Sequence, residues 1–388
     1  MAFSEENLAN HLGGLGYSEE QIELMDVATS FCRDKSPIDK VRKLMADERG
    51  YDPAVWQEIA ELGWLGIAIP EAHGGVGLSM AEVAPIAEQM GRRLLTTPFA
   101  TCTVAAQALL AAGDEAQCGE WLPRIVAGEI ATLALSEPHG DWTLSHVEAT
   151  AKASGEGYAL SGTKQFVAYA QDAALVIATV NVDGAVRLAL IERSAIPDGA
   201  LRREIIVDET RRTYELTLDG ITVPASALLD AGRSASALNQ IELASALLQA
   251  AEMCGGTQSA IDYTIEYLKT RKQFGKLIGE YQALKHPITN AYVAYEKARS
   301  HMLSAAHNFG QQGVGEIAVR MAKASADKAY SFAADRAVQF HGGFGFTHDC
   351  DAGLYRRSAI WHASQFGDAA WHRAKLADLL FCCLLYTS

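Results

Sequence analysis

The chain has 388 residues, of which 49% are hydrophobic and 21% are charged, and its formal net charge is −14. This length is enough for two or three domains with ordinary cores, and the composition is that of a soluble globular protein. The acidic surplus argues against a nucleic-acid-binding protein, whereas an anionic small molecule would need only a few local arginines.

The cysteines and the first residues indicate a cytoplasmic protein. There are seven cysteines, an odd number, and no CxxC pair, so neither a disulfide framework nor a metal site is predicted. The opening MAFSEENLAN is acidic and lacks the apolar core of a signal peptide. No apolar run approaches the roughly 20 residues that a membrane span requires.

Residues 1–127 predict an N-terminal helical domain. In YDPAVWQEIAELGWLG, Asp52 is a helix N-cap, Pro53 occupies the first helical position, and Gly63 ends the helix. Helical spacing of apolar residues continues to about residue 127, which indicates several short helices.

Residues 128–232 predict a middle domain of antiparallel strands. The segment ALVIATVNVDGAVRLALIE consists of two β-rich runs around Asp183-Gly184, which predicts a hairpin. A second hairpin is expected around the Gly-Glu-Gly turn at residues 155–157. Several short strands without intervening helices are typical of an antiparallel barrel or sandwich.

Residues 233–388 predict a C-terminal four-helix bundle. The first helix would cover about 40 residues and, if unbroken, would be about 60 Å long, with Gly255-Gly256 as a point where it could bend. Further helices are expected at about 281–310, 315–340 and 362–385. The fold class is therefore α+β: an all-α domain, an antiparallel β domain and a helical bundle.

Three glycine clusters raise the question of a nucleotide site. They lie at residues 13–16, 74–77 and 342–345, and none follows a buried strand, which excludes the Rossmann fingerprint. The first two are expected to be turns between helices. The third follows a helix C-terminus, so it would have to offer its own backbone N–H groups to a phosphate.

Two strings in the C-terminal part identify a family. RKQFGKLIGEYQ, read together with QFHGGFGFT, resembles the acyl-CoA dehydrogenase family, and ALSEPHGD and LSGTKQFV agree less specifically. The resemblance covers nearly the whole chain and implies the α+β fold above. It also implies FAD-dependent α,β-desaturation of an acyl-CoA thioester, an electron-transfer flavoprotein as electron acceptor, and a tetramer of this chain alone or with a homologous subunit.

The resemblance places the ADP half of FAD at the glycine cluster. It implies that Arg271, Gln273 and Phe274 contact the pyrophosphate and adenosine, with Gln282 nearby. It also implies that the pyrophosphate is covered by Gln339 and by the backbone of Phe340, His341, Gly342 and Gly343. The alternatives are a surface ion pair of Arg271 with Glu266 or Glu280, and a plain helix cap at Gln339 and Gly342.

The resemblance is weaker at the flavin ring. It implies that Leu135 and Ser136 border the flavin and that Phe166 packs against the ring. Ala168 stands where the family usually has a threonine whose hydroxyl bonds flavin N5. Trp142 stands where a small residue often meets the thioester arm of CoA.

The carboxylate base of the family reaction is missing. A base must remove the α-proton while the β-hydride leaves to the flavin. Phe366 occupies the position of the usual base, and Ser245 occupies the position of the helix-borne base that a minority of members use. Neither side chain can accept the proton.

Three explanations compete for the missing base. Asp368 or Glu242 could act as a relocated base. The chain could be the base-lacking partner in a heteromeric dehydrogenase, or a relative with other flavin chemistry such as desulfination or oxygenation. A purely structural subunit without flavin is the non-enzymatic alternative.

We favour the partner subunit. QFHGGFGFTHDCDAGLYRRS and FGDAAWHRAKLAD resemble the bacterial small subunits of pimeloyl-CoA and steroid side-chain acyl-CoA dehydrogenases, which often form α2β2 heterotetramers. The resemblance therefore places the protein in fatty acid or steroid degradation. The adenosine-end residues are kept while the ring-end and base residues are altered, as a site shared between subunits would permit.

Overall fold

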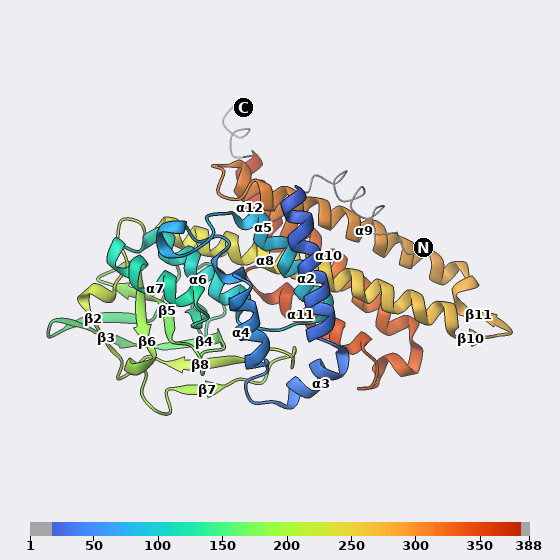
Figure 1. Cartoon of the computed structure of the whole chain (residues 1–388), viewed down its shortest axis with the longest axis horizontal. Coiled ribbons are helices and arrows are strands. Elements are labelled where there is room, and N and C mark those ends of the chain that lie inside the picture. The colour runs from blue at the N-terminus through green and yellow to red at the C-terminus, as the bar shows by residue number, and fades with distance from the viewer. Residues whose placement is uncertain (1–17, 382–388) are drawn as a thin grey trace. The chain divides into compact units, whose positions relative to one another are not determined.

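The computed structural model describes residues 18–381 (Figure 1). The chain divides into two compact units. The helical unit contains the described residues up to Arg42, then Met80–Leu95 and the chain from Ala246 onward. The β unit contains Lys43–Ser79 and Thr96–Ser245. The three domain boundaries expected from sequence stay predictions, and the 13–16 glycine turn, Cys382 and Cys383 lie outside the described residues.

The helical unit is built around three long helices. Its elements are α2 (Glu19–Lys35), α5 (Met80–Arg93), the later part of α8 (Ser234–Thr270), α9 (Gln282–His307), α10 (Val314–Phe340), α11 (Ala352–Ser364) and α12 (Ala369–Phe381). A short ribbon of β10 (Lys272–Gln273) and β11 (Lys276–Leu277) follows α8, and α3 (Ile38–Ala46) continues the chain into the β unit. Over the 18–381 range, no helix is long and apolar enough to cross a membrane.

The glycine pair in α8 serves packing rather than bending. α8 is assigned as one helix of 37 residues that continues through Gly255 and Gly256. A Cβ atom at Gly255 would lie 1.8 Å from the backbone oxygen of Glu88 in α5, and one at Gly256 would lie 2.4 Å from the Tyr330 ring in α10. The two glycines therefore let neighbouring helices approach α8 closely.

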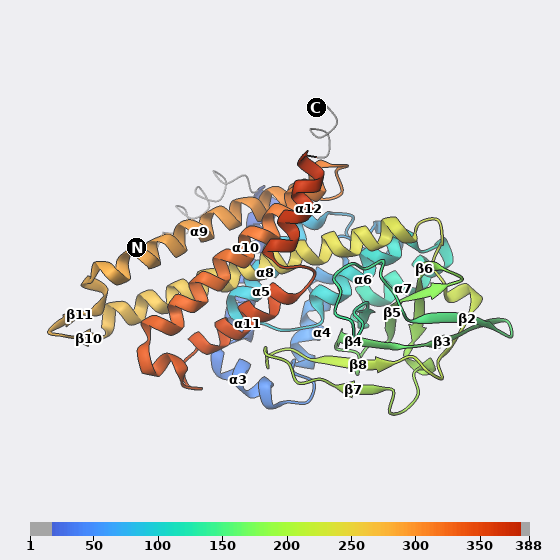
Figure 2. The same cartoon turned by 180° about the vertical axis from the view of Figure 1, so that it is seen from behind.

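The last predicted helix is interrupted. Instead of one helix over 362–385, α11 ends at Ser364 and α12 begins at Ala369; residues 382–385 lie outside the described range. Phe366 and Gly367 have φ angles of 52° and 91°, which no right-handed helix accommodates. Asp368 then caps α12, because its Oδ1 accepts the Trp371 N–H at 2.7 Å. Figure 2 shows the two helices from behind.

The β unit combines two sheets with short helices. The larger sheet has the order β1 (Ala131–Ala134), β5 (Leu175–Val182), β2 (Thr150–Ser154), β3 (Gly157–Ser161), β9 (Thr222–Pro224), with β6 (Ala185–Glu192) paired to β5. The smaller has the order β4 (Thr163–Ala168), β8 (Thr213–Thr217), β7 (Leu201–Arg203). The pairing is antiparallel except where β5 meets β1 and β2. The helices are α4 (Pro53–Glu61), α6 (Phe99–Ala112) and α7 (Glu115–Val126).

Local signals in the sequence correctly placed several of these elements. Asp52 caps α4 by accepting the Ala54 N–H at 2.9 Å, with Pro53 first in the helix. The β5–β6 hairpin turns at Asp183 and Gly184, whose φ angles of 50° and 88° are those of a type I′ turn. The predicted α+β class is confirmed.

Candidate functional site

A cavity of about 830 Å³ in the helical unit, here called the cradle, contains most of the predicted ADP-end residues. It lies between the end of α8, the β10–β11 ribbon, the end of α10 and the 3₁₀ turn Gly342–Phe346. Every residue predicted for this end lines it except Gln282. The lining residues are Tyr267, Arg271, Gln273, Phe274, Ile278, Leu284, Gln339, Phe340, His341, Gly342, Gly343 and Phe344.

Arg271 lines the cradle, and its guanidinium has no ion-pair partner among residues 18–381. Its backbone is fixed, since its N–H donates to the Tyr267 oxygen at 2.9 Å and its oxygen accepts the Ile278 N–H at 2.9 Å. Glu266 pairs with Lys269 at 2.8 Å, and Glu280 accepts the Leu277 N–H at 3.2 Å. Such a guanidinium on a fixed backbone suits bidentate binding of a phosphate.

Different structural features explain the glycines in and beside the cradle. Gly342 has a φ angle of 61°, and a Cβ at Gly345 would lie 2.2 Å from the Val338 oxygen, so backbone geometry and packing explain these two. Gly343 has an ordinary φ, and a Cβ there would meet nothing within 4 Å. The space beside Gly342 and Gly343 is therefore open, as the approach of a ligand phosphate to their backbone would require.

Aromatic side chains are unusually exposed beside the cradle. Phe274 is 91% exposed on a backbone with φ 53°, and Phe346 is 83% exposed. A bulky residue with positive φ is strained, and strain of this kind clusters at binding sites. An exposed ring held by its backbone suits stacking against another flat group.

The predicted ring-end residues come together in the β unit. The Ser136 oxygen accepts the Gln165 N–H at 2.9 Å, which sets Leu135 and Ser136 beside β4. A bulge between Lys164 and Val167 puts Phe166 at φ 56° and leaves it 42% exposed. Ser136 therefore lies beside the strand that carries Phe166, and the contacts of Leu135, Ser136 and Phe166 with a flavin stay predictions.

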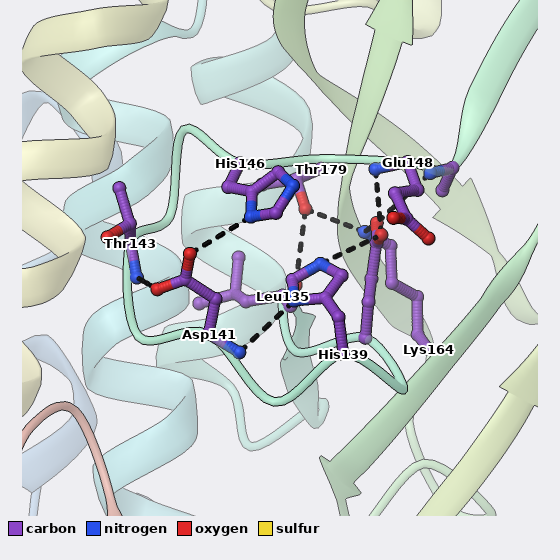
Figure 3. Close-up of polar contacts among 10 residues, drawn as sticks. Leu135, His139, Asp141, Thr143, His146, Glu148, Lys164 and Thr179 are labelled. Carbon is purple, nitrogen blue, oxygen red and sulfur yellow. Dashed lines mark hydrogen bonds and ion pairs between the residues drawn. The ribbon is translucent and has the colours of Figure 1, made fainter.

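A buried ion pair supports this end of the site, and sequence reasoning missed it. Lys164 Nζ donates to Glu137 Oε1 at 2.5 Å and to Thr179 Oγ1 at 2.8 Å (Figure 3). Burial by itself would raise the pKa of Glu137, but Lys164 and the N–H groups of Glu148 and Ala149 bring it below its ordinary value. The sequence features that could have indicated this ion pair are a lysine inside a β-rich run and a glutamate before a loop.

The loop after Glu137 is fixed by two histidines. The His139 and His146 rings stack with centroids 4.4 Å apart, and His146 Nδ1 lies 2.9 Å from Asp141 Oδ2 (Figure 3). The Thr143 N–H and His146 lower the pKa of Asp141 to about 2. These contacts hold the segment that carries Trp142.

The described part of the chain contains no His, Cys, Asp or Glu group suited to a metal ion.

The loop at Phe366 is held in place by buried side chains. Buried Lys323 donates from Nζ to the His362 oxygen at 3.0 Å and to the Gly367 oxygen at 2.8 Å. His372 Nε2 lies 2.9 Å from the Phe366 oxygen, which can only accept. Burial lowers the pKa of Lys323 to about 8, and burial with the nearby positive charges lowers that of His372 to about 3.

The candidate bases Asp368 and Glu242 stay predictions, and the Ser245 hydroxyl cannot accept the proton. Ser245, in the β unit, is 4% exposed, and its hydroxyl has no partner among the residues described. Asp368 already serves as the cap of α12. Glu242 lies half-buried on α8, also in the β unit.

Comparisons with known proteins agree with the predicted family. The family models described as "Acyl-CoA dehydrogenase, N-terminal domain" and "Acyl-CoA dehydrogenase, C-terminal domain" match residues 18–129 and 232–378. Acyl-CoA dehydrogenase FadE12 of Mycobacterium tuberculosis is 29% identical over 343 residues, covering 83% of this chain and 85% of that protein. Acyl-CoA dehydrogenase IpdE2 of the same organism is 29% identical over 347 residues, covering 88% and 91%.

A solved structure shows the same fold. A variant of the Tcur3481-Tcur3483 steroid ACAD has a TM-score of 0.84 and 28% identity, covering 96% of this chain and 99% of that one. The cradle and the ring-end strands are built from segments on which the family resemblance rested. The chain belongs to the acyl-CoA dehydrogenase family, a family of flavoenzyme oxidoreductases.

Proposed function

We propose that this chain is the base-lacking subunit of an FAD-dependent acyl-CoA dehydrogenase and acts with a homologous subunit that carries the base. The proposal rests mainly on the family resemblance, which places Phe366 and Ser245 at both familiar base positions. Neither side chain can accept a proton, while the residues suited to the pyrophosphate remain. The reaction is α,β-desaturation of an acyl-CoA thioester.

The chemistry of the cradle fits the ADP half of FAD. Arg271 supplies a cation that forms no ion pair in the described part of the chain. Gly342 and Gly343 leave open space beside their backbone, and Phe274 supplies an exposed aromatic face. A cation and backbone N–H groups would neutralise a pyrophosphate, and a flat ring would stack on an adenine. Bound FAD would supply the hydride acceptor for the desaturation.

Exposed apolar surface supports a subunit partner. Phe274, Phe344 and Phe346 are exposed near the cradle. A groove of about 640 Å³ between α9, α10 and α12 exposes Met321 and Phe332. Exposed apolar patches of this kind mark contacts between proteins. The similar steroid ACAD structure is named for a pair, Tcur3481-Tcur3483, which agrees with a heterotetramer here.

The relocated-base alternative is less well supported. Asp368 already accepts the Trp371 N–H, so a catalytic role would compete with capping α12. The flavin-free alternative gives no role to the guanidinium of Arg271, which has no ion-pair partner among the described residues, or to the open space at Gly343. Electrons would leave the flavin to an electron-transfer flavoprotein, as the family implies.

The test is turnover with and without a partner. The chain should be expressed alone and together with a homologous subunit that carries a helix-borne glutamate. Flavin bleaching by acyl-CoA and reduction of an artificial acceptor are then measured. A positioned base contributes roughly 10² to 10⁴-fold, so we expect the lone chain to be slower by about that factor.

Matched variants separate the alternatives. We expect Asp368→Asn and Glu242→Gln to leave the activity of the complex unchanged, whereas removal of the partner's glutamate abolishes it. Robust turnover by the lone chain that is lost in Asp368→Asn would contradict the proposal and identify Asp368 as the base.

A further inference from the structure

The loop between β1 and β2 contains a pair of histidines that the proposed function does not use. Its central part, residues 138–147, is here called the histidine loop. The rings of His139 and His146 stack with centroids 4.4 Å apart and an interplanar angle of 18°. Each imidazole also lies beside a carboxylate: His139 Nε2 is 3.4 Å from Glu137 Oε2, and His146 Nδ1 is 2.9 Å from Asp141 Oδ2 (Figure 3). Imidazoles change their charge between about pH 5 and 8, so these contacts depend on protonation.

The tautomer of His139 follows from its contact with the backbone. The Asp141 N–H donates to His139 Nδ1 at 3.1 Å, and a backbone N–H group can only donate. Nδ1 is therefore the acceptor and carries no hydrogen, so the hydrogen of the ring is on Nε2, the nitrogen beside Glu137. In the loop as folded, His139 is a neutral imidazole.

A second proton on His139 would break this contact. A doubly protonated ring donates from both nitrogens, so Nδ1 and the Asp141 N–H would be two donors facing each other. The stack adds to the cost, because a cationic His139 would lie against His146, which itself becomes a cation at low pH. Glu137 would favour the cation, but Lys164 of β4 already pairs with its carboxylate at 2.5 Å.

His146 responds to protonation in the opposite sense. A carboxylate oxygen only accepts, so His146 Nδ1 donates to Asp141, and a positive charge on the ring strengthens this bond. The Thr143 N–H donates to the other Asp141 oxygen at 2.8 Å, and with His146 it lowers the pKa of Asp141 to about 2. Asp141 therefore keeps its charge as the pH falls, and His146 can gain a proton while the loop stays closed.

We propose that the histidine loop is a pH-sensitive latch: neutral His139 holds the Asp141 N–H, and protonation of His139 Nδ1 releases it. The released loop binds one more proton than the closed loop, so a fall in pH favours release. Release loosens the segment that carries Trp142. The inference does not depend on the proposed function. The charged and titratable side chains around His139 are Glu137, Asp141, His146 and Glu148 of the loop and its ends, and Lys164 of β4.

Hydrogen exchange of the full chain at residue resolution, between about pH 7.5 and 5, tests the latch. The reporter is the Asp141 N–H, with its protection taken relative to the intrinsic exchange rate at each pH. We expect its protection to fall by roughly 2- to 10-fold as the pH falls, since one hydrogen bond is lost. The Gly184 N–H is the internal control, because it donates to the side chain of Asn181 at 2.8 Å, an amide that does not titrate.

The main variant is His139→Asn. The asparagine oxygen takes roughly the place of Nδ1 and can accept the Asp141 N–H, but it does not titrate. We therefore expect the protection of Asp141 in this variant to be independent of pH. His146→Asn is the matched control, because it keeps a donor for Asp141 and removes the other titrating ring. In this control the loss of protection at low pH should remain.

His139→Phe provides a second variant, which keeps a ring for the stack and removes the acceptor. We expect the Asp141 N–H to be poorly protected in it at both ends of the pH range. Equal protection of Asp141 at pH 7.5 and 5 in the wild type would overturn the proposal. A pH dependence that persists in His139→Asn and His139→Phe but disappears in His146→Asn would also overturn it, because the response would then belong to His146. No outcome involves flavin or turnover, so the proposed function is tested separately.

Discussion

The clearest physical prediction concerns Lys323, the buried lysine beneath the Phe366 loop. Its ammonium donates to the oxygens of His362 and Gly367, which lie at the end of α11 and in the loop before α12. Lys323→Met keeps a side chain of similar length and removes both hydrogen bonds. We expect the main effect to be release of this loop rather than loss of the core.

The magnitude follows from two opposing effects. Hydrogen bonds from a charged donor contribute about 1.5–3 kcal/mol each, so two contribute about 3–6 kcal/mol. The pKa of Lys323 falls from 10.5 to about 8, which corresponds to a burial cost of about 3 kcal/mol for the ammonium. Removal of the charge recovers that cost, so we expect a net loss of about 0–3 kcal/mol in the free energy of unfolding.

Hydrogen exchange and urea unfolding together test the prediction. The N–H of Ala369 donates to Asp327 Oδ2 at 2.8 Å and reports on the loop. We expect its protection to fall in Lys323→Met, by about tenfold for each 1.4 kcal/mol of net stability that is lost. Lys328→Met, an exposed lysine on the same helix, is the control. Unchanged protection of Ala369, or a global loss well above 3 kcal/mol, would refute the reasoning.

Three further predictions concern other charged groups. Arg271→Ala should weaken retention of FAD by about ten- to a hundred-fold, because a charge-assisted bond contributes about 1.5–3 kcal/mol, and leave the urea midpoint unchanged; unchanged flavin content after dialysis would contradict this. His372 has a folded pKa of about 3 against an ordinary 6.5, so the unfolded chain binds the extra proton between these values and stability falls as the pH falls through that window. We therefore expect the free energy of unfolding to depend less on pH in His372→Gln, by up to about 1.4 kcal/mol per pH unit. Urea unfolding at pH 4 to 7 measures this difference. Lys164→Met should cost about 3–5 kcal/mol of unfolding free energy because Glu137 is left buried without its cation, and the double variant with Glu137→Gln should recover part of the loss.

Local sequence signals predicted the features that depend on neighbouring residues. The Asp52-Pro53 start of α4 and the Asp183-Gly184 turn follow from backbone preferences that a few adjacent residues determine. The order of helices, strands and helices follows from hydrophobic periodicity. Most of the residues that the family motifs single out lie in two short continuous strings and line the cradle, and their contacts with FAD stay predictions.

Packing between distant segments decided the rest. Gly255 and Gly256 could bend a helix by their sequence, but the proximity of Glu88 and Tyr330 makes them points of close approach. Lys164 and Lys323 look like ordinary surface lysines in the sequence. Only the tertiary fold buries them and brings an acceptor within reach, because a charge is tolerated inside a protein only where remote parts of the chain supply its partners.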